Sequence, residues 1–293
     1  MLQSLLLACF AASAVSADCT KDFLRNATKA YISAQSSGQS SIFSALGTTA
    51  NFLYVENNKL ADFKSSTLSK PIKIDFNRSI HDTAQCATFT EIIAATDPHP
   101  YVIHTRIVFE ASTLHAAIVE SVVTDQGDWL FNATGTLNLV TPEKWEPIPK
   151  ESQESRAQIQ SYADAYFDRF GNVSVNVPWG PPCSRVEGGL PANGELRGED
   201  CIHVWPSTIY VPYRRYVVDE EYGAVDIFVG FPGLDRTRNT WAAPDSHFFR
   251  GEKGKIKYLH TASACFTDGC GLNGTTSFGR RGLDGRRAVR LGV

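Results

Sequence analysis

The feature that most constrains this fold is a polar segment near the middle of the chain, 143–150, which carries two prolines. It separates two halves of similar size, and each half opens with an amphipathic helix before long β-rich runs. In the second half, apolar side chains recur with helical spacing at Ile159, Tyr162, Ala163, Tyr166, Phe167 and Phe170. Ser155 and Gln158 form a capping-box signature before this stripe, and Gly171 supplies a stop. A similar stripe opens the first half at Phe23, Ala27, Ala30, Tyr31 and Ala34.

The β-rich runs that follow each helix indicate antiparallel sheets. They span 102–109, 114–124 and 129–139 in the first half, and 213–219, 224–231, 246–250 and 255–264 in the second. A helix followed by a curved antiparallel sheet predicts an α+β fold in which the helices cover one sheet face. We therefore predict two tandem cone-like modules, 18–142 and 155–265, joined by a linker, 143–154. The Gly/Arg-rich tail, 266–293, lacks periodicity and is expected to be disordered or to be removed by processing.

The N-terminus and the cysteines predict export. Residues 1–17 carry no charged side chain and end in Val15-Ser16-Ala17, the small-x-small pattern that places signal-peptide cleavage before Asp18. No later run of about 18 apolar residues follows, so stable membrane insertion is not expected. Six cysteines remain after cleavage, and an even number in an exported chain indicates disulfides. The preferred pairs are Cys19–Cys86, Cys183–Cys201 and Cys265–Cys270.

Zinc is the rival interpretation of these cysteines, but the chain contains neither a C-x-x-C nor an H-E-x-x-H motif, and no metal is predicted. Five N-x-S/T sequons agree with a secreted glycoprotein; their asparagines are Asn26, Asn77, Asn132, Asn172 and Asn273. The balance of 28 Lys+Arg against 31 Asp+Glu provides no basic surface for nucleic acid. Because G-x-S-x-G, G-x-G-x-x-G and Walker motifs are also missing, no cofactor is predicted.

Four short strings in the second half carry a family resemblance: PPCSRVEGG from Pro181, RRYVVD from Arg214, PDSH from Pro244 and GKIKYLH from Gly254. Together they resemble a largely uncharacterised family of secreted fungal proteins, similar to the nuclear-transport-factor-2-like superfamily. That superfamily includes ketosteroid isomerase, scytalone dehydratase and the SnoaL-like cyclases. The resemblance covers about 155–265 best, and it implies a curved sheet wrapped around helices with a pocket at the open end.

The last predicted hairpin supplies candidate catalytic residues. If its turn is 251–254, His247 faces Tyr258, and strand alternation places His260 and Asp245 on the same sheet face. We then expect His247 to act as a base, His260 and Tyr258 as donors, and Asp245 to orient an imidazole. The structural alternative is that Asp245 and Ser246 cap a strand and that backbone groups satisfy both histidines. A register slip of one residue would reverse the assignment.

Two Arg–carboxylate sets form candidate substrate-binding residues: Arg185 with Glu187, and Arg215 with Asp219. An arginine there could clamp a carboxylate substrate in a bidentate way. The favoured alternative is a structural ion-pair network that ties the Cys183 loop to the sheet.

The resemblance implies an isomerase, cyclase or dehydratase that acts on a small carbonyl compound by proton transfer without a metal. A narrower expectation is the dimerisation of anhydride monomers into maleidride metabolites. The competing hypotheses are a non-catalytic module that binds a small hydrophobic ligand or a cell-wall glycan, and a secreted interaction protein. We expect a monomer in which the tandem modules form a pseudo-dimer.

Overall fold

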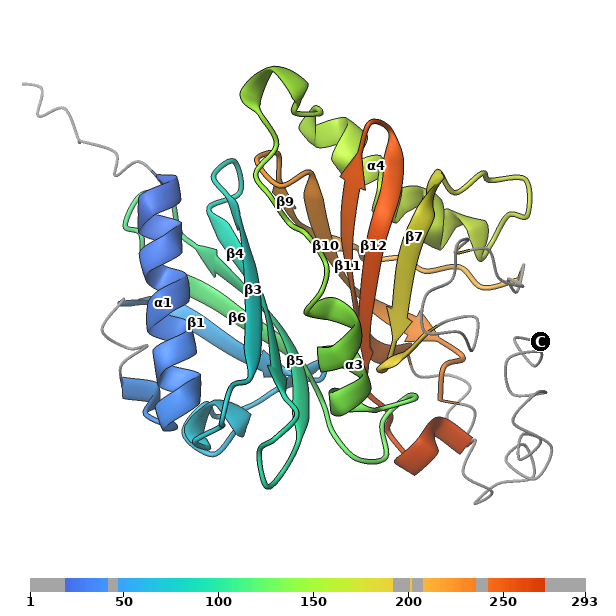
Figure 1. The fold of residues 1–293 in the computed structure, drawn as a ribbon. Helices are drawn as coiled ribbons and strands as arrows, with labels where there is room; N and C mark the ends of the chain where they lie inside the picture. The colour runs from blue at the N-terminus through green and yellow to red at the C-terminus, as the bar shows by residue number, and fades with distance from the viewer. Residues whose placement is uncertain (1–18, 42–46, 192–200, 202–207, 236–241, 272–293) are drawn as a thin grey trace, which may run out of the picture.

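The computed structural model describes residues 19–41, 47–191, 201, 208–235 and 242–271 (Figure 1). The predicted leader, Asn273 and all but the first six residues of the predicted tail lie outside these residues. The structure confirms an α+β fold with two sheet modules.

The first half is one long helix and a six-stranded sheet. Helix α1 (Lys21–Ser37) begins at Thr20, whose side chain accepts a hydrogen bond from Phe23 N, and ends at Gly38 in the left-handed conformation. The sheet has the order β2-β1-β6-β5-β4-β3, and only the β1–β6 pair is parallel. Its strands are β1 (Thr48–Glu56), β2 (Lys59–Leu60), β3 (Phe76–Asp82), β4 (Ala87–Ala94), β5 (Tyr101–Phe109) and β6 (Ala116–Thr124), with the 3₁₀ helix η1 (Thr67–Ser69) before β3.

The second half has the same order of one long helix followed by six strands. Helix α4 (Arg156–Arg169) begins at Ser155, whose side chain accepts from Gln158 N as predicted. The sheet order β8-β7-β12-β11-β10-β9 matches that of the first sheet, and its parallel pair, β7–β12, is equivalent to β1–β6. The strands are β7 (Trp179–Glu187), β8 (Leu190–Pro191), β9 (Arg215–Asp219), β10 (Ala224–Pro232), β11 (Ala242–Glu252) and β12 (Lys255–Ser263), followed by η3 (Asp268–Gly271).

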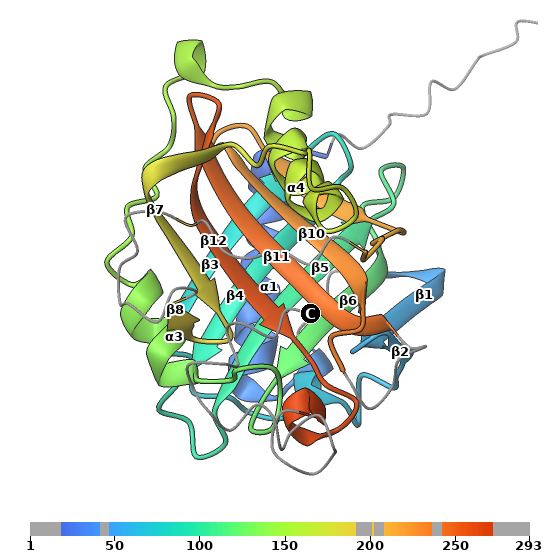
Figure 2. The same ribbon diagram turned by 90° about the vertical axis from the view of Figure 1, so that its right-hand side faces the viewer.

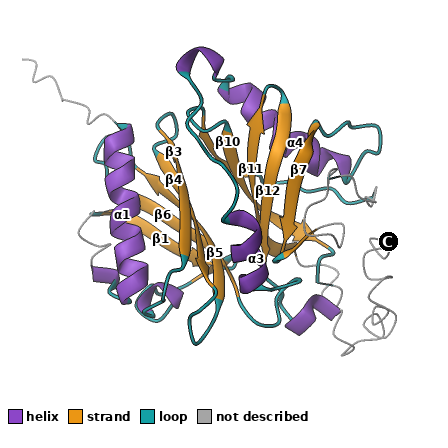
Figure 3. Cartoon of the chain, viewed as in Figure 1, coloured by secondary structure: helices purple, strands orange, loops and turns teal. Residues whose placement is uncertain are grey.

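The two sheets pack face to face, with the long helices on the outside (Figures 1 and 2). Figure 3 shows the resulting order of layers, from α1 through both sheets to α4. One apolar core lies under each helix, and a third lies between the sheets around Phe89, Phe228 and Phe248. Each module therefore has an outer sheet face covered by its helix and an inner face covered by the other module.

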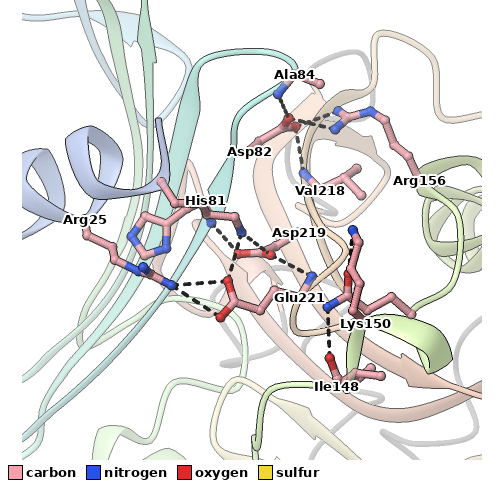
Figure 4. A network of polar contacts seen from close by, with 12 residues as sticks. Arg25, His81, Asp82, Ala84, Ile148, Lys150, Arg156, Val218, Asp219 and Glu221 are labelled. Carbon is pink, nitrogen blue, oxygen red and sulfur yellow. Dashed lines mark hydrogen bonds and ion pairs between the residues drawn. The ribbon is translucent and has the colours of Figure 1, made fainter. Parts of the chain in front are cut away.

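Two aspartates lock the modules together with mirrored contacts (Figure 4). Asp82, at the end of β3, accepts a hydrogen bond from Val218 N at 2.9 Å, and Asp219, at the end of β9, accepts one from His81 N at 2.8 Å. Each carboxylate also pairs with the first residue of a long helix: Asp82 with Arg156 of α4, and Asp219 with Lys21 of α1. The sequence gives little indication of these contacts, because each one joins residues of different halves of the chain.

One predicted strand is wrong. The run 129–139 is instead a loop followed by the short helix α3 (Ala133–Val140), whose N-terminus is capped by the Asn132 side chain on Gly135 N at 2.9 Å. The buried positions Ala133, Thr136 and Val140 follow helical spacing, which the aromatic residues and threonines of the run concealed because these residue types favour strands. Beyond α3 the chain passes through the 3₁₀ helix η2 (Lys150–Ser152) to α4, and on the way it contacts the second sheet, where Arg250 Nη2 donates to Glu146 O at 2.9 Å.

The structure bears on the predicted disulfides and on the exposure of the sequons. All three predicted disulfides are present. Four of the five sequon asparagines, Asn26, Asn77, Asn132 and Asn172, lie in the described residues and are exposed. None of the described helices combines the length and the apolar character needed to cross a bilayer.

Candidate functional site

The register of the β11–β12 hairpin differs from the predicted one. Its turn consists of only Lys253 and Gly254, both at positive φ, and Lys257 is an extra residue in a bulge. His247 therefore faces Thr261 rather than Tyr258. The bulge reverses the alternation along β12, so the predicted grouping of His247 with Tyr258 and His260 on one face is wrong. Arg250, which pairs with Tyr258, is buried on the inner face.

His247 and Asp245 lie on the outer face of the second sheet, beneath α4. His247 is 5% exposed, and its ring lies 4.8 Å from that of Phe167 and 5.0 Å from that of Tyr166. Its Nδ1 is 3.2 Å from Asp245 Oδ2, a contact without hydrogen-bond geometry. The other oxygen of Asp245 accepts from Ser263 Oγ at 2.6 Å. The carboxylate of Asp245 thus lies next to the imidazole of His247 on the face that α4 covers.

The parallel pairing of β7 with β12 brings Arg185 and Glu187 to the same face. Thr261 pairs with both His247 on β11 and Glu187 on β7, so these three residues form one row across the sheet. Arg185 Nη2 lies 2.8 Å from Glu187 Oε2 and donates to the Tyr166 hydroxyl at 2.8 Å. Sequence reasoning treated Arg185 and Glu187 as a set separate from His247 and assigned Tyr166 only to the core.

Three buried polar atoms in this group have no hydrogen-bond partner among the described residues. They are His247 Nδ1, Arg185 Nε and Thr261 Oγ1. Their side chains come from three adjacent strands and share the face that α4 covers. A cluster of unsatisfied polar atoms in one place costs stability and calls for an explanation, and functional sites are where such groups gather.

The first module provides an internal comparison. Its equivalent row is Thr105, Ser121 and Glu56, beneath Tyr31 of α1. There the Tyr31 hydroxyl contacts Thr105 Oγ1 at 2.7 Å, and Thr105 Oγ1 contacts Ser121 Oγ at 2.8 Å. Glu56 accepts from Tyr54, Thr67 N and Thr67 Oγ1. The same place in the fold is therefore closed by two hydroxyl groups and one carboxylate that all have hydrogen-bond partners, whereas the second module places a histidine and an arginine there with partly unsatisfied polar atoms.

His260 lies on the opposite, inner face, in a buried network between the sheets. Its Nδ1 is 2.9 Å from Glu91 Oε1, and its Nε2 is 2.8 Å from Glu143 Oε2. Burial opposes the charged imidazolium, but the carboxylates of Glu143 and Glu91 outweigh it and raise the pKa of His260 to about 9. Burial likewise opposes ionisation of Glu91, yet His260 and His104 hold the pKa of this carboxyl below its usual range.

Ser246, His104 and Glu91 have the connectivity of a catalytic triad. His104 Nδ1 is 2.8 Å from Ser246 Oγ, and His104 Nε2 is 3.4 Å from Glu91 Oε1. All three residues are fully buried between the sheets, and the Ser246 hydroxyl donates to Asp226 Oδ1 at 2.8 Å rather than to the imidazole. The arrangement therefore serves the inter-module core, because the Ser246 proton is not directed at the imidazole as a triad requires.

The remaining predicted residues also belong to the inter-module contact. Tyr258 stacks on Trp145, with ring centroids 5.9 Å apart. Arg215 Nε donates to Glu120 Oε2 at 3.0 Å, and Asp219 is part of the lock described above. Arg215 and Asp219 therefore form structural ion pairs with residues of the first half, Arg215 with Glu120 and Asp219 with Lys21. Neither pair includes Arg185. Among the described residues, no group of three or more His, Cys, Asp or Glu is arranged to hold a metal ion.

One family model matches the second module. A sequence profile of a domain of unknown function (DUF8021) matches residues 152–263. This range contains the residues described around His247, which are Asp245, Arg185, Glu187, Tyr166 and Thr261. No curated protein matches the chain. Among solved structures, PrhC from Penicillium brasilianum NBRC 6234 is 10% identical, with a TM-score of 0.25, over 36% of this chain and 82% of its own. The match to a family of unknown function agrees with the resemblance seen in the sequence, and the superfamily stays a prediction.

Proposed function

We propose that the second module is a metal-free acid–base catalyst that acts on a small carbonyl compound as an isomerase, cyclase or dehydratase. The observation that supports this proposal is that the Asp245–His247 pair and Arg185 lie around Tyr166 with unsatisfied polar atoms, on a face where the equivalent groups of the first module all have hydrogen-bond partners. Within the superfamily that the sequence resembles, the narrower proposal is a cyclisation that joins two metabolite units.

In the proposed reaction, His247 takes a proton from the carbon next to the substrate carbonyl. Because Asp245 lies against Nδ1, Nε2 is the nitrogen that accepts this proton. The electron pair of the broken C–H bond moves onto the carbonyl oxygen, where Arg185 Nε and the Thr261 hydroxyl are the available donors. The imidazolium then returns the proton to another carbon, which isomerises the substrate, or protonates a leaving hydroxyl, which releases water.

The charge state of the site suits this role. Burial disfavours the guanidinium, but Glu187 and the Tyr166 hydroxyl more than compensate and raise the pKa of Arg185 above its ordinary value. Arg185 therefore stays positively charged, so it can stabilise an enolate oxygen at any pH at which the protein is folded. The three disulfides fit an oxidising compartment, which supports a protein that works in or beyond the secretory pathway.

The test is a metabolite profile of a strain that lacks the gene, rescued with wild type or with variants. His247→Ala removes the proposed base, and Thr105→Ala changes the equivalent position of the first module as a matched control. We expect a precursor to accumulate without the gene and to be cleared by wild type and Thr105→Ala, but not by His247→Ala. Thermal unfolding of each variant establishes that the rescue compares folded proteins.

Clearance of the precursor by His247→Ala would refute this catalytic role. If blocking the site with a larger side chain at Thr261 then abolished rescue, a non-catalytic module that binds a small ligand or a glycan would replace the proposal. His260 is excluded from this experiment because it belongs to the inter-sheet network.

A further inference from the structure

A loop of the first half reaches the candidate site of the second module. Residues 125–132 follow β6 and lead into α3, which lies beside β7 and β8 (Figure 2). Within this loop, Trp129 Nε1 donates to Glu187 Oε1 at 3.0 Å. The backbone of Trp129 is also tied to the end of β12, where its N–H donates to Ser263 O at 3.3 Å.

The loop is firmly placed against the second sheet. Asp128 Oδ1 accepts from Cys265 N at 2.6 Å, directly after β12. Gly188, in the turn between β7 and β8, has a φ of +57°, and a Cβ built on it would lie 2.2 Å from Trp129 O. Only glycine fits such a close approach, so the chain at this point is built to bring the two backbones together.

Glu187 connects the indole to the site. One of its oxygens accepts from Trp129, and the other pairs with Arg185, whose guanidinium contacts Tyr166. With its two oxygens engaged on opposite sides, the carboxylate has a single orientation, and this orientation sets where the Arg185 fork lies. In the first module, the equivalent Glu56 is held only by residues of its own half, Tyr54 and Thr67.

We propose that Trp129 is a positioning residue of the second module's site and that it acts through Glu187 on Arg185. The site is then complete only when the first module supplies this loop. This inference rests on the proposed function for its catalytic consequence, but its structural core, the control of Arg185 by Trp129, can be tested without any substrate.

The test uses the full-length oxidised protein and two variants that each remove one indole donor from a carboxylate. Trp129→Phe deletes the bond to Glu187, and Trp145→Phe deletes the comparable bond from Trp145 Nε1 to Glu143 Oε2, at 2.9 Å, in the inter-sheet network. The first readout is the water-exchange rate of the Arg185 Nε–H, followed by NMR. We expect Trp129→Phe to speed this exchange about tenfold, the equivalent of one hydrogen bond to a charged group, and Trp145→Phe to leave it unchanged.

The second readout is the affinity of 2-naphthol, whose oxyanion imitates an enolate and whose fluorescence is excited beyond the tryptophan band. Trp129→Phe should weaken binding about tenfold. Glu187→Gln should weaken it similarly, and the double variant should be no worse than either single one, because both act on one chain of contacts. Should Trp129→Phe fold poorly, Glu187→Gln carries the exchange measurement in its place.

Unchanged exchange at Arg185 in both Trp129→Phe and Glu187→Gln would overturn the positioning role. Additive losses of naphthol affinity would overturn the route through Glu187. If Arg185 exchange responds as expected but wild type does not bind naphthol, the positioning role stands and the proposed enolate chemistry fails.

Discussion

The lock between the modules leads to a quantitative prediction about stability. Asp219 is fully buried, accepts from His81 N at 2.8 Å and from Glu221 N at 3.0 Å, and pairs with Lys21. Asp219→Asn keeps the shape of the side chain but removes its charge and turns one acceptor into a donor that faces other donors. Removing one partner of a buried ion pair costs about 3–5 kcal/mol, and since asparagine keeps one acceptor, we expect a loss of about 3 kcal/mol.

A matched control lies two residues away. Glu221 also crosses between the modules, with an oxygen 3.2 Å from Arg25 Nη2, but its side chain is 28% exposed. Glu221→Gln should therefore cost less than about 1 kcal/mol, as for a solvent-screened pair. In urea titrations followed by tryptophan fluorescence, Asp219→Asn should unfold at clearly lower urea than Glu221→Gln, and its Tm should fall by about 6–12 °C.

The mirrored aspartate extends the test. Because Asp82 makes the equivalent contacts, with Val218 N and Arg156, Asp82→Asn should destabilise the protein as much as Asp219→Asn. Equal and small effects of Asp219→Asn and Glu221→Gln would refute the reasoning, since they would mean that burial of the aspartate contributes nothing. A large effect of only one aspartate would show that the two halves of the lock are not energetically equivalent.

Three further predictions concern other parts of the molecule. The pKa of His260 is about 9 in the folded protein against 6.5 when unfolded, so its ion pairs stabilise the fold fully below pH 6.5 and this contribution is lost as the pH rises through 9. In urea titrations, wild type should therefore be more stable than His260→Gln by about 3 kcal/mol at pH 6, and this difference should vanish by pH 10. The Cys19–Cys86 disulfide spans 67 residues, so its replacement by two alanines should cost about 4 kcal/mol in the same titration, and a loss below about 1 kcal/mol would contradict the loop-closure account. Gly188→Ala should lower the Tm by several degrees and expose Trp129, and an unshifted fluorescence maximum would show that the loop does not need this close approach.

Local patterns in the sequence were enough for the two long helices and for the strands β5, β6 and β9 to β12, whereas the other strands and α3 were not predicted. The apolar stripe of α4, its Ser155 cap and the strands from β9 to β12 follow from periodicities of 3.6 and 2 residues, which depend only on how side chains leave the backbone. The preferred cysteine pairs match the three disulfides, although the cysteine count by itself leaves other pairings open. The strand predicted over 129–139 is wrong because the aromatic residues and threonines of this run favour a strand, whereas the helix α3 forms where the run packs against strands of both sheets.

The candidate site depended on tertiary structure. Asp245 and His247 were correctly placed on one face by alternation, but a single bulged residue, Lys257, carried His260 to the other side of the sheet. Because alternation has a period of two, one extra residue exchanges the faces of everything beyond it, and no local signal marks where a bulge falls.

The placement of Arg185 and His247 around Tyr166 shows the same division. The sequence determined which polar residues each strand carries, since that is a property of neighbouring positions. Whether β7 lies next to β12, and whether Trp129 from the other half reaches Glu187, is decided by contacts between residues tens of positions apart. Those contacts form only when the apolar faces of both sheets and of the two long helices are buried together. The tertiary structure therefore decides which residues of the candidate site lie close to one another.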